Sequence, residues 1–176
     1  MENIIIDEGG VRDKRAIQLA TRKNRWIPNV VRLESPPARL NAAVLIHRIS
    51  HPNAQLRSLT SVYNCMGLVF AARRTWIGIS DIDSPLGLIL EDDGYRKVED
   101  EKKVMLGDVV VYKDAEKRVS HVGVVAKIDT DIINGDRKLR VMSQWGADGE
   151  YIHDCDDLPM HIGKTSIEFW TERKGV

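Results

Sequence analysis

The second half of the chain holds a series of short β-rich segments, and this series constrains the fold more than any other feature. A Gly107-Asp108 pair precedes the first segment, and Asn134-Gly135 marks a turn between the second and the third. Strands joined by short links pair antiparallel, because a parallel pair needs a long crossover connection. The segments are residues 109–112, 119–128, 139–145 and 166–171. Together with helices earlier in the chain, they predict an α+β fold with an antiparallel sheet.

Two segments ahead of these strands have helical character. From Cys65 onward, apolar residues follow the i, i+3, i+4, i+7 spacing of an amphipathic helix, and Ser61 or Asn64 can cap its start. Gly67, which has no side chain, lets this helix lie close against a sheet. Residues 39–49 predict a second, buried helix. Its apolar positions are Ala43, Leu45, Ile46 and Ile49.

Composition and charge exclude several classes of protein. The chain has 176 residues, of which 43% are hydrophobic and 30% charged, so it is long enough for one globular domain with a full core. Lysine and arginine balance aspartate and glutamate, and the formal net charge is zero. Neither nucleic acid nor membrane is therefore an expected partner. The apolar run at residues 42–46 is too short to span a bilayer.

The first 37 residues differ from the rest of the chain. Pro28, Pro36 and Pro37 interrupt regular structure there, so we predict an N-terminal extension over residues 1–37 and a domain over residues 38–176. The extension either packs on the edge of the domain or docks a partner. Acidic residues at the N-terminus stand where a signal peptide needs basic ones. This predicts a cytoplasmic protein, unless a dedicated secretion system exports it.

The chain has only two cysteines, so we expect reduced thiols rather than a disulfide framework. Cys65 begins a predicted helix, where unpaired N–H groups and the helix dipole lower the pKa of a thiol. His121, if the fold brings it alongside, completes the activation of the thiol. This pair predicts a papain-like thiol site. The hydroxyl of Tyr63 either packs nearby or donates a hydrogen bond to the developing oxyanion.

A metal site is not expected. His153, Cys155 and His161 follow a His-x-Cys-x5-His spacing that matches no standard zinc pattern, and a polar loop is the preferred interpretation. The chain has neither a Walker loop nor a dinucleotide glycine fingerprint. The prediction is that the protein uses no cofactor.

Three blocks of sequence, in this order, resemble the motifs of NlpC-type thiol hydrolases. Asn64-Cys65-Met66-Gly67-Leu68-Val69 resembles the nucleophile motif, residues 106–112 resemble the Gly-Asp strand entry, and Ser120-His121-Val122-Gly123 resembles the histidine strand. The blocks lie within residues 59–146, with Asn64 in place of the family's acid and Met66 in place of its small residue. The resemblance implies a papain-like fold in which the nucleophile helix packs on an antiparallel sheet. It also implies that Cys65 is the nucleophile and His121 the general base.

The resemblance further implies a third polar residue, which orients the imidazole and lies on the strand after the histidine. If Asn134-Gly135 forms a two-residue turn, position 144 pairs with position 125 and shares a face with His121. Gln144 is then the third catalytic residue. A slip of one residue would bring Ser143 or Trp145 inward instead.

The sequence thus predicts a cysteine peptidase or amidase that attacks an amide carbonyl through Cys65 and protonates the leaving group through His121. Its substrate is a peptide or amide, either a peptidoglycan fragment or a partner protein cut by an intracellular toxin or defence effector. An acyltransferase or a glutamine deamidase would use the same site. Two rivals remain open. One is a non-catalytic adapter with a degenerate thiol-hydrolase fold that docks a partner through residues 1–37, and the other is a redox sensor that uses Cys65 alone.

Overall fold

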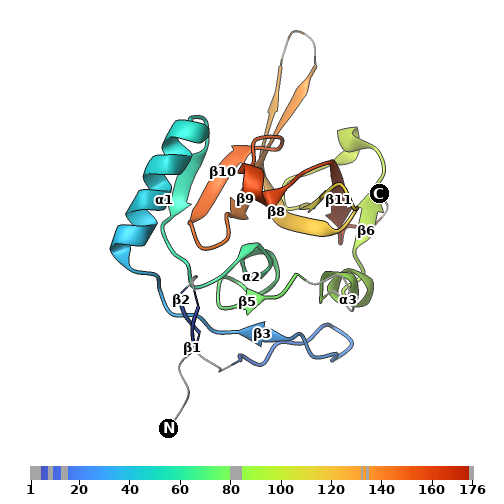
Figure 1. The fold of residues 1–176 in the computed structure, drawn as a ribbon. Coiled ribbons are helices and arrows are strands. Elements are labelled where there is room, and N and C mark those ends of the chain that lie inside the picture. The colour runs from blue at the N-terminus through green and yellow to red at the C-terminus, as the bar shows by residue number, and fades with distance from the viewer. Residues whose placement is uncertain are drawn as a thin grey trace.

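A seven-stranded antiparallel sheet forms the centre of the protein (Figure 1). The computed structural model describes residues 16–79, 85–131, 133 and 135–174, together with the backbone of residues 5–7 and 10–12. In spatial order the strands of the sheet are β4 (Gln55–Ser58), β10 (Glu150–Asp154), β9 (Arg137–Gln144), β8 (Val119–Thr130), β7 (Val109–Lys113), β11 (Ser166–Thr171) and β6 (Arg96–Val98). Every neighbouring pair is antiparallel. The predicted α+β class with an antiparallel sheet is therefore confirmed.

Shorter elements surround the sheet. The helices are α1 (Pro37–Ser50), α2 (Cys65–Phe70) and α3 (Pro85–Asp92), with single 3-10 turns η1 (Glu101–Lys103) and η2 (Met160–Ile162). Two small ladders pair β1 (Ile5–Asp7) with β2 (Gly10–Arg12), and β3 (Asn29–Val30) with β5 (Trp76–Ile77). No helix of the described residues is long and apolar enough to cross a membrane.

The two faces of the sheet support separate cores. On one face, here called the α2 face, Val111 and Val122 belong to a buried cluster that includes Cys65. On the opposite face, here called the α1 face, Val110 and Tyr112 belong to a second cluster. Successive side chains of a strand point to opposite faces. This alternation decides which of the predicted site residues can meet.

Helix α1 covers part of the α1 face through its histidines. The ring of His47 lies 4.9 Å from that of Trp145, and the ring of His51 lies 5.1 Å from Trp145. Trp145 in turn stacks on Tyr151 of β10, with ring centroids 4.2 Å apart. These aromatic contacts and the buried Leu40 fix the inner side of the helix.

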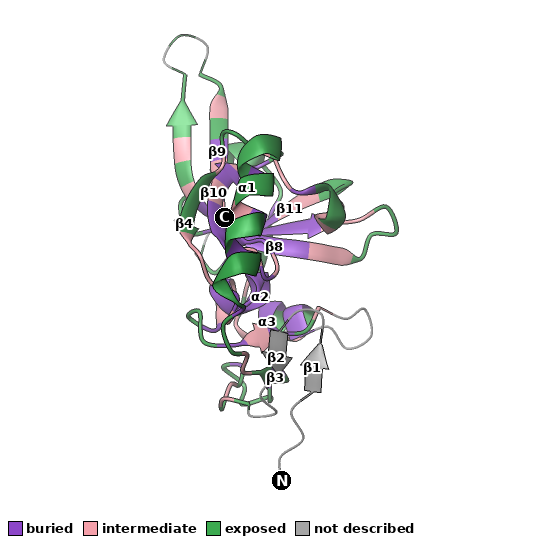
Figure 2. Ribbon diagram, turned by 60° about the vertical axis from the view of Figure 1, so that its left-hand side comes forward, coloured by how far each residue is buried: buried purple, intermediate pink, exposed green. Residues whose placement is uncertain are grey.

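The prediction of a fully buried helix over residues 39–49 is wrong for its outer side. The helix forms, but Leu45 is 63% exposed, Ile46 61% and Ile49 82%. Figure 2 shows α1 as largely exposed beside the buried strands of the sheet. A helix that meets a sheet on one side buries one face only, and here Leu40, Ala43 and His47 form that face. The apolar residues of the other face have no cover among the described residues.

The pairing of β8 with β9 differs from the predicted register. Val124 pairs with Met142 and Val125 with Val141, whereas the prediction paired position 125 with position 144. An irregularity between Val125 and Lys127 inserts an extra residue into β8. The turn is also longer, because the N–H of Asp131 donates to the carbonyl of Asp136 at 2.8 Å. Asn134, on which the prediction rested, lies outside the described residues.

Residues 16–35 pack against the α2 face. Ile27 is 1% exposed and joins the same cluster as Cys65. The hydroxyl of Thr21 donates to Asp92 at the end of α3, at 2.6 Å. The side chain of Asn29 accepts from the N–H of Ile17 at 3.0 Å. This part of the predicted N-terminal extension therefore shares the core of the sheet, while a docking role for residues 1–37 stays a hypothesis.

Candidate functional site

Asn64 fixes the start of α2 and therefore the position of Cys65. Its side-chain oxygen accepts from the N–H of Gly67 at 3.0 Å, as a helix cap does, and from the N–H of Ile77 at 3.2 Å. Its amide nitrogen donates to the carbonyl of Ile77 at 2.7 Å. Asn64 thus ties the helix start to β5, and Asn rather than an acid suits this role because it both accepts and donates.

Gly67 allows the close packing of α2 that the sequence predicts. A Cβ atom at this position would lie 1.8 Å from the carbonyl oxygen of Thr75. Any side chain would therefore force the helix away from the backbone before β5. The close approach is to this segment rather than to the main sheet.

The thiol of Cys65 lies at the predicted helix start but is sealed from solvent, because the residue is only 4% exposed. Hydrogen bonds from the backbone N–H groups of Val122, Met66 and Cys65 itself lower its pKa. Burial in the apolar cluster has the larger and opposite effect, and it raises the pKa of the Cys65 thiol to about 11. In this conformation the sulfur is a protonated thiol at neutral pH, not a nucleophilic thiolate.

His121 lies on the other face of the sheet from Cys65, and the predicted dyad is not assembled. Its partner across the ladder is Tyr112, whose ring centroid lies 5.7 Å from the imidazole, and Tyr112 belongs to the α1-face cluster. The physical reason is the alternation of the strand. Val122 packs on the α2 face with Cys65, so the preceding residue must point to the opposite face.

The imidazole of His121 is buried and neutral. It is 2% exposed, and its Nε2 atom has no hydrogen-bond partner among the described residues. Burial, with smaller contributions from His153 and His161, lowers the pKa of His121 to about 3. A base with this pKa takes up a proton from a thiol poorly near neutral pH.

Gln144 and Ser143 also lie on different faces from one another. Gln144 donates to the carbonyl of Thr60 at 2.7 Å and to that of Gly146 at 3.2 Å, so it fastens a loop rather than orienting His121. Ser143 shares the α1 face with His121. Gly123 of β8 lies opposite Ser143 of β9, since a Cβ atom at position 123 would lie 3.1 Å from the Cβ atom of Ser143. Gly123 and His121 are two residues apart in β8 and therefore point to the same face. The prediction of Gln144 fails because the register differs by an odd number of residues.

Ser143 forms a buried hydrogen-bonded pair that the sequence did not predict. Its hydroxyl lies 2.8 Å from Nε2 of His153, and Nδ1 of His153 lies 2.8 Å from the carbonyl of Asp154. An imidazole that donates from Nδ1 to a carbonyl accepts at Nε2, so the Ser143 hydroxyl is the donor. Both residues are fully buried. The pair resembles a serine–histidine dyad in its bonding, but neither side chain is accessible to solvent.

Tyr63 contacts the buried carboxylate of Glu150, which also pairs with the partly exposed Arg73. Its hydroxyl donates to Glu150 Oε2 at 2.8 Å, and Arg73 Nε donates to the same oxygen at 2.7 Å. Burial and the Glu150 carboxylate raise the pKa of Tyr63 to about 12. Hydrogen bonds from Arg73 and Tyr63 outweigh burial and lower the pKa of Glu150. This network joins the segment before α2, the segment after it and β10.

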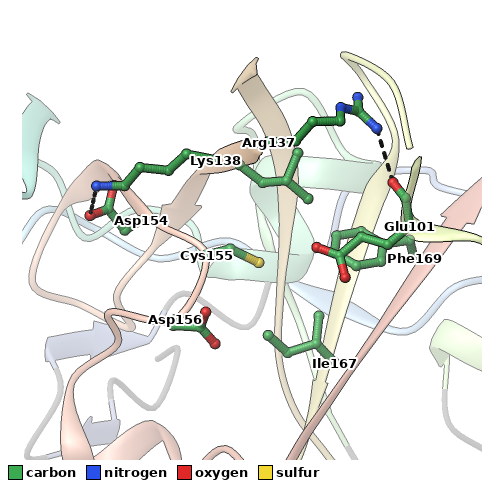
Figure 3. A pocket seen from close by; sticks show the side chains of 9 residues that line it. Glu101, Arg137, Lys138, Asp154, Cys155, Asp156, Ile167 and Phe169 are labelled. Carbon is green, nitrogen blue, oxygen red and sulfur yellow. Dashed lines mark hydrogen bonds and ion pairs between the residues drawn. The ribbon is translucent and has the colours of Figure 1, made fainter. Parts of the chain in front are cut away.

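One cavity, of about 310 Å³, lies on the α1 face beside Cys155 (Figure 3). Ile167 and Phe169 stand across the cavity from the thiol, and Arg137 and Lys138 border its rim. Both basic side chains are already engaged: Lys138 pairs with Asp154 at 2.8 Å, and Arg137 donates to the carbonyl of Glu101 at 3.0 Å. Burial raises the pKa of the Cys155 thiol to about 11.

A second cavity, of about 400 Å³, forms a groove between α3 and the sheet. We call it the α3 groove. Its walls are mainly apolar. Two charged residues also line it, Lys113 and Glu168, and they form an ion pair with 2.9 Å between Nζ and Oε1. The apolar lining residues are Leu86, Leu90, Tyr95, Val111, Val119 and Trp170. The sequence analysis predicted no helix here, although the run Leu86-Gly87-Leu88-Ile89-Leu90 could have indicated a buried helix.

Within the described part of the chain, no group of three or more His, Cys, Asp or Glu side chains is arranged to hold a metal ion. The prediction of a polar loop is wrong for His153, which lies within β10 and is fully buried, and Cys155 directly follows that strand and is also buried.

The fold and these sites define an α+β protein with a central seven-stranded antiparallel sheet and a separate core on each face of it. Comparison with protein-family models, with curated proteins and with solved structures finds no match for this chain. The NlpC-type resemblance therefore stays a prediction from three short motifs.

Proposed function

We propose that this protein is a non-catalytic binding protein, in which the cysteine and histidine motifs build the core instead of an active site. The observation that carries this proposal is the separation of Cys65 and His121 by the sheet. A histidine activates a thiol only within hydrogen-bond reach. Crossing the sheet would require β8 to shift by one residue, which would exchange every side chain of the strand between the two cores.

The protonation states of the two residues also support a structural role. Burial raises the pKa of the Cys65 thiol to about 11 and lowers the pKa of His121 to about 3. Activation of a dyad needs shifts in the opposite directions. Both side chains instead behave as core residues, which is common for a buried cysteine.

The α3 groove is the surface that we assign to binding. Its volume and its apolar lining match a site for a small apolar group or for a side chain of a peptide. Trp170 and Tyr95 provide aromatic walls, and the ion pair of Lys113 with Glu168 provides polar partners for the end of a ligand. The ligand class that follows is an apolar or aromatic group that carries one polar end.

Alkylation of the native protein with iodoacetamide tests the proposal. The rate at Cys65 is measured between pH 6 and pH 10 by intact mass, in wild type and in the His121→Ala variant, with Cys65→Ala as the control for Cys155. We expect slow labelling, and an apparent pKa from the pH dependence of the rate that lies above the ordinary thiol value of about 8.5. The His121→Ala variant should give the same apparent pKa. Fast labelling at pH 6 that is lost in His121→Ala would reject the proposal.

A cysteine hydrolase is the second candidate function, and one observation favours it. Three backbone N–H groups, those of Cys65, Met66 and Val122, act on the sulfur at the start of α2. Such donors stabilise a thiolate or an oxyanion once solvent and substrate enter. Peptidase, amidase, acyltransferase and deamidase reactions would all begin with the same thiolate. This candidate requires a reactive Cys65, so the alkylation rates separate it from the binding protein.

A further inference from the structure

The outer side of α1 is an uninterrupted apolar seam. Ala38, Ala42, Leu45 and Ile49 are all exposed, and Leu45 and Ile49 are 63% and 82% exposed. Single exposed apolar residues are common on proteins, but a row of them along one helix is not. The seam is fixed facing outward, because Nε2 of His47 lies 3.3 Å from Asp148 on the opposite side of the helix.

The four seam residues have the spacing of a coiled coil. They are separated by four, three and four positions, which is the alternation of a and d residues in a heptad repeat. Asn41 and Arg48 border the seam on one side, and Arg39 and Ile46 border it on the other. The seam itself contains no charged or polar side chain, so a matching helix can cover it without burying a charge.

We propose that this seam joins two copies of the chain through an antiparallel pair of α1 helices about a two-fold axis. The axis passes at the level of the helix between Ala43 and Val44. Each seam residue of one helix then contacts one seam residue of the partner helix, and every such contact joins a small side chain to a large one. Ala38 faces the partner's Ile49, and Ala42 faces the partner's Leu45. Alternating small and large residues fill an interface evenly. A parallel pair would place alanine on alanine and leucine on leucine, which leaves gaps in one layer and crowding in the next.

The residues that border the seam support a second copy as the occupant. In the antiparallel arrangement Asn41 meets the partner's Arg48, whose guanidinium can donate to the amide oxygen. Arg39 meets the partner's Ile46, so no two arginines face each other. Within the chain Arg39 already pairs with Asp148 at 3.4 Å. The chain is neutral overall, and long-range repulsion does not oppose self-association.

The area of the seam fits a weak dimer. A helix of 14 residues is about 21 Å long, and an apolar patch of this extent is on the order of a few hundred Å². Two such patches approach the roughly 1,000 Å² at the lower limit of specific interfaces. We therefore expect a dissociation constant in the micromolar range rather than a permanent dimer. The dimer goes beyond the proposed binding function and does not depend on it, because the α3 groove is lined by other elements.

Sedimentation velocity of the full chain across a range of concentrations measures this dimer. The expected result is a monomer–dimer equilibrium that Leu45→Glu weakens at least about tenfold, since a charge must then be buried in the interface. Leu106→Glu, which places the same charge at an equally exposed leucine just before β7, is the matched control and should change the constant by less than about threefold. A chain that stays monomeric at several hundred micromolar, or a dimer that Leu45→Glu leaves intact, overturns the proposal. Circular dichroism confirms that each variant is folded.

Cysteine cross-linking tests the antiparallel geometry. Ala42→Cys and Leu45→Cys proteins are oxidised separately and as a mixture, while Cys65 and Cys155 are buried and do not compete. The mixture should cross-link much faster than either variant alone, because position 42 faces the partner's position 45. Faster self-linking of Leu45→Cys would indicate a parallel pair and contradict the proposal. Co-sedimentation of a monomeric protein with phosphatidylglycerol vesicles, lost in Leu45→Glu, would assign the seam to a membrane surface and also overturn it.

Discussion

Replacing His121 with leucine should remove about half of the acid sensitivity of the fold. The ordinary pKa of a histidine is 6.5, whereas burial lowers the pKa of His121 to about 3 and that of His153 to about 4. Below pH 6.5 the unfolded chain takes up protons at both residues, and the folded chain does not. The stability that these neutral imidazoles contribute is therefore complete above pH 6.5 and is lost as the pH falls toward 4.

The magnitude follows from the two pKa shifts. Each pH unit below 6.5 lowers the free energy of unfolding by about 1.4 kcal/mol for each buried histidine. Between pH 7 and pH 5 the loss is about 2 kcal/mol for each residue and about 4 kcal/mol for the pair. Carboxylates contribute little in this interval, because most of them are ionised at pH 5 in both the folded and the unfolded chain.

Urea denaturation at pH 7, 6 and 5 measures these values in wild type and in His121→Leu. We expect wild type to lose about 4 kcal/mol and the variant about 2 kcal/mol. At pH 7 the variant should be as stable as wild type or more stable, because Nε2 of His121 is buried without a hydrogen-bond partner among the described residues. An equal loss in both proteins would mean that His121 titrates as an exposed group, which would refute its placement in the α1-face core.

Three further substitutions test the packing around the candidate site by chemical denaturation. Gly67→Ala should destabilise the protein by more than about 3 kcal/mol, because the new Cβ atom would collide with the Thr75 carbonyl; a loss below 1 kcal/mol would contradict this contact. Glu150→Gln should cost about 2 kcal/mol, since it removes the charge that pairs with Arg73, and the effect should vanish when Arg73 is already replaced by Gln. Ser143→Ala should cost about 1 kcal/mol and leave iodoacetamide labelling of Cys65 unchanged, because the Ser143–His153 pair lies across the sheet; faster labelling would oppose that placement.

The sequence predicted the class of the fold and several of its strands because those features depend on local patterns. The four β-rich segments correspond to β7, β8, β9 and β11, and the start of α2 at Cys65 follows from its spacing and its cap. The segments of β4, β6 and β10 carry charged and polar residues in short stretches, and no pattern separated them from loops. Their partners in the sheet hold them in place, and such partners cannot be identified from a local window.

The geometry of the site could not be predicted because it depends on which alternate residues of each strand point to which face of the sheet. His121 and Val122 are neighbours in the chain, and only the packing of the whole sheet decides which of them faces Cys65. The irregularity between Val125 and Lys127 then shifts β9 by a residue and places Ser143, rather than Gln144, on the face of His121. A motif of correctly ordered residue types therefore does not determine whether their side chains meet.

The exposed side of α1 and the α3 groove were missed for different physical reasons. The apolar residues of α1 occur on all sides of the helix, and this composition predicts burial when only one copy of the chain is considered. The helix α3 lies within a stretch rich in aspartate and glutamate, which masked its short apolar run. The exposed side of α1 and the α3 groove both lie on the surface, and whether a residue lies on the surface depends on how the whole chain packs around it.

The placement of Cys65 and His121 on opposite faces is tested most directly by engineered disulfides. Val122→Cys and His121→Cys variants are oxidised under mild conditions, and intact mass with peptide mapping reports whether residue 65 is bridged. We expect a bridge from Cys65 to position 122, whose side chain lies in the same buried cluster as the thiol, and none to position 121. A bridge to position 121, with none to position 122, would place the histidine beside the thiol and contradict the account.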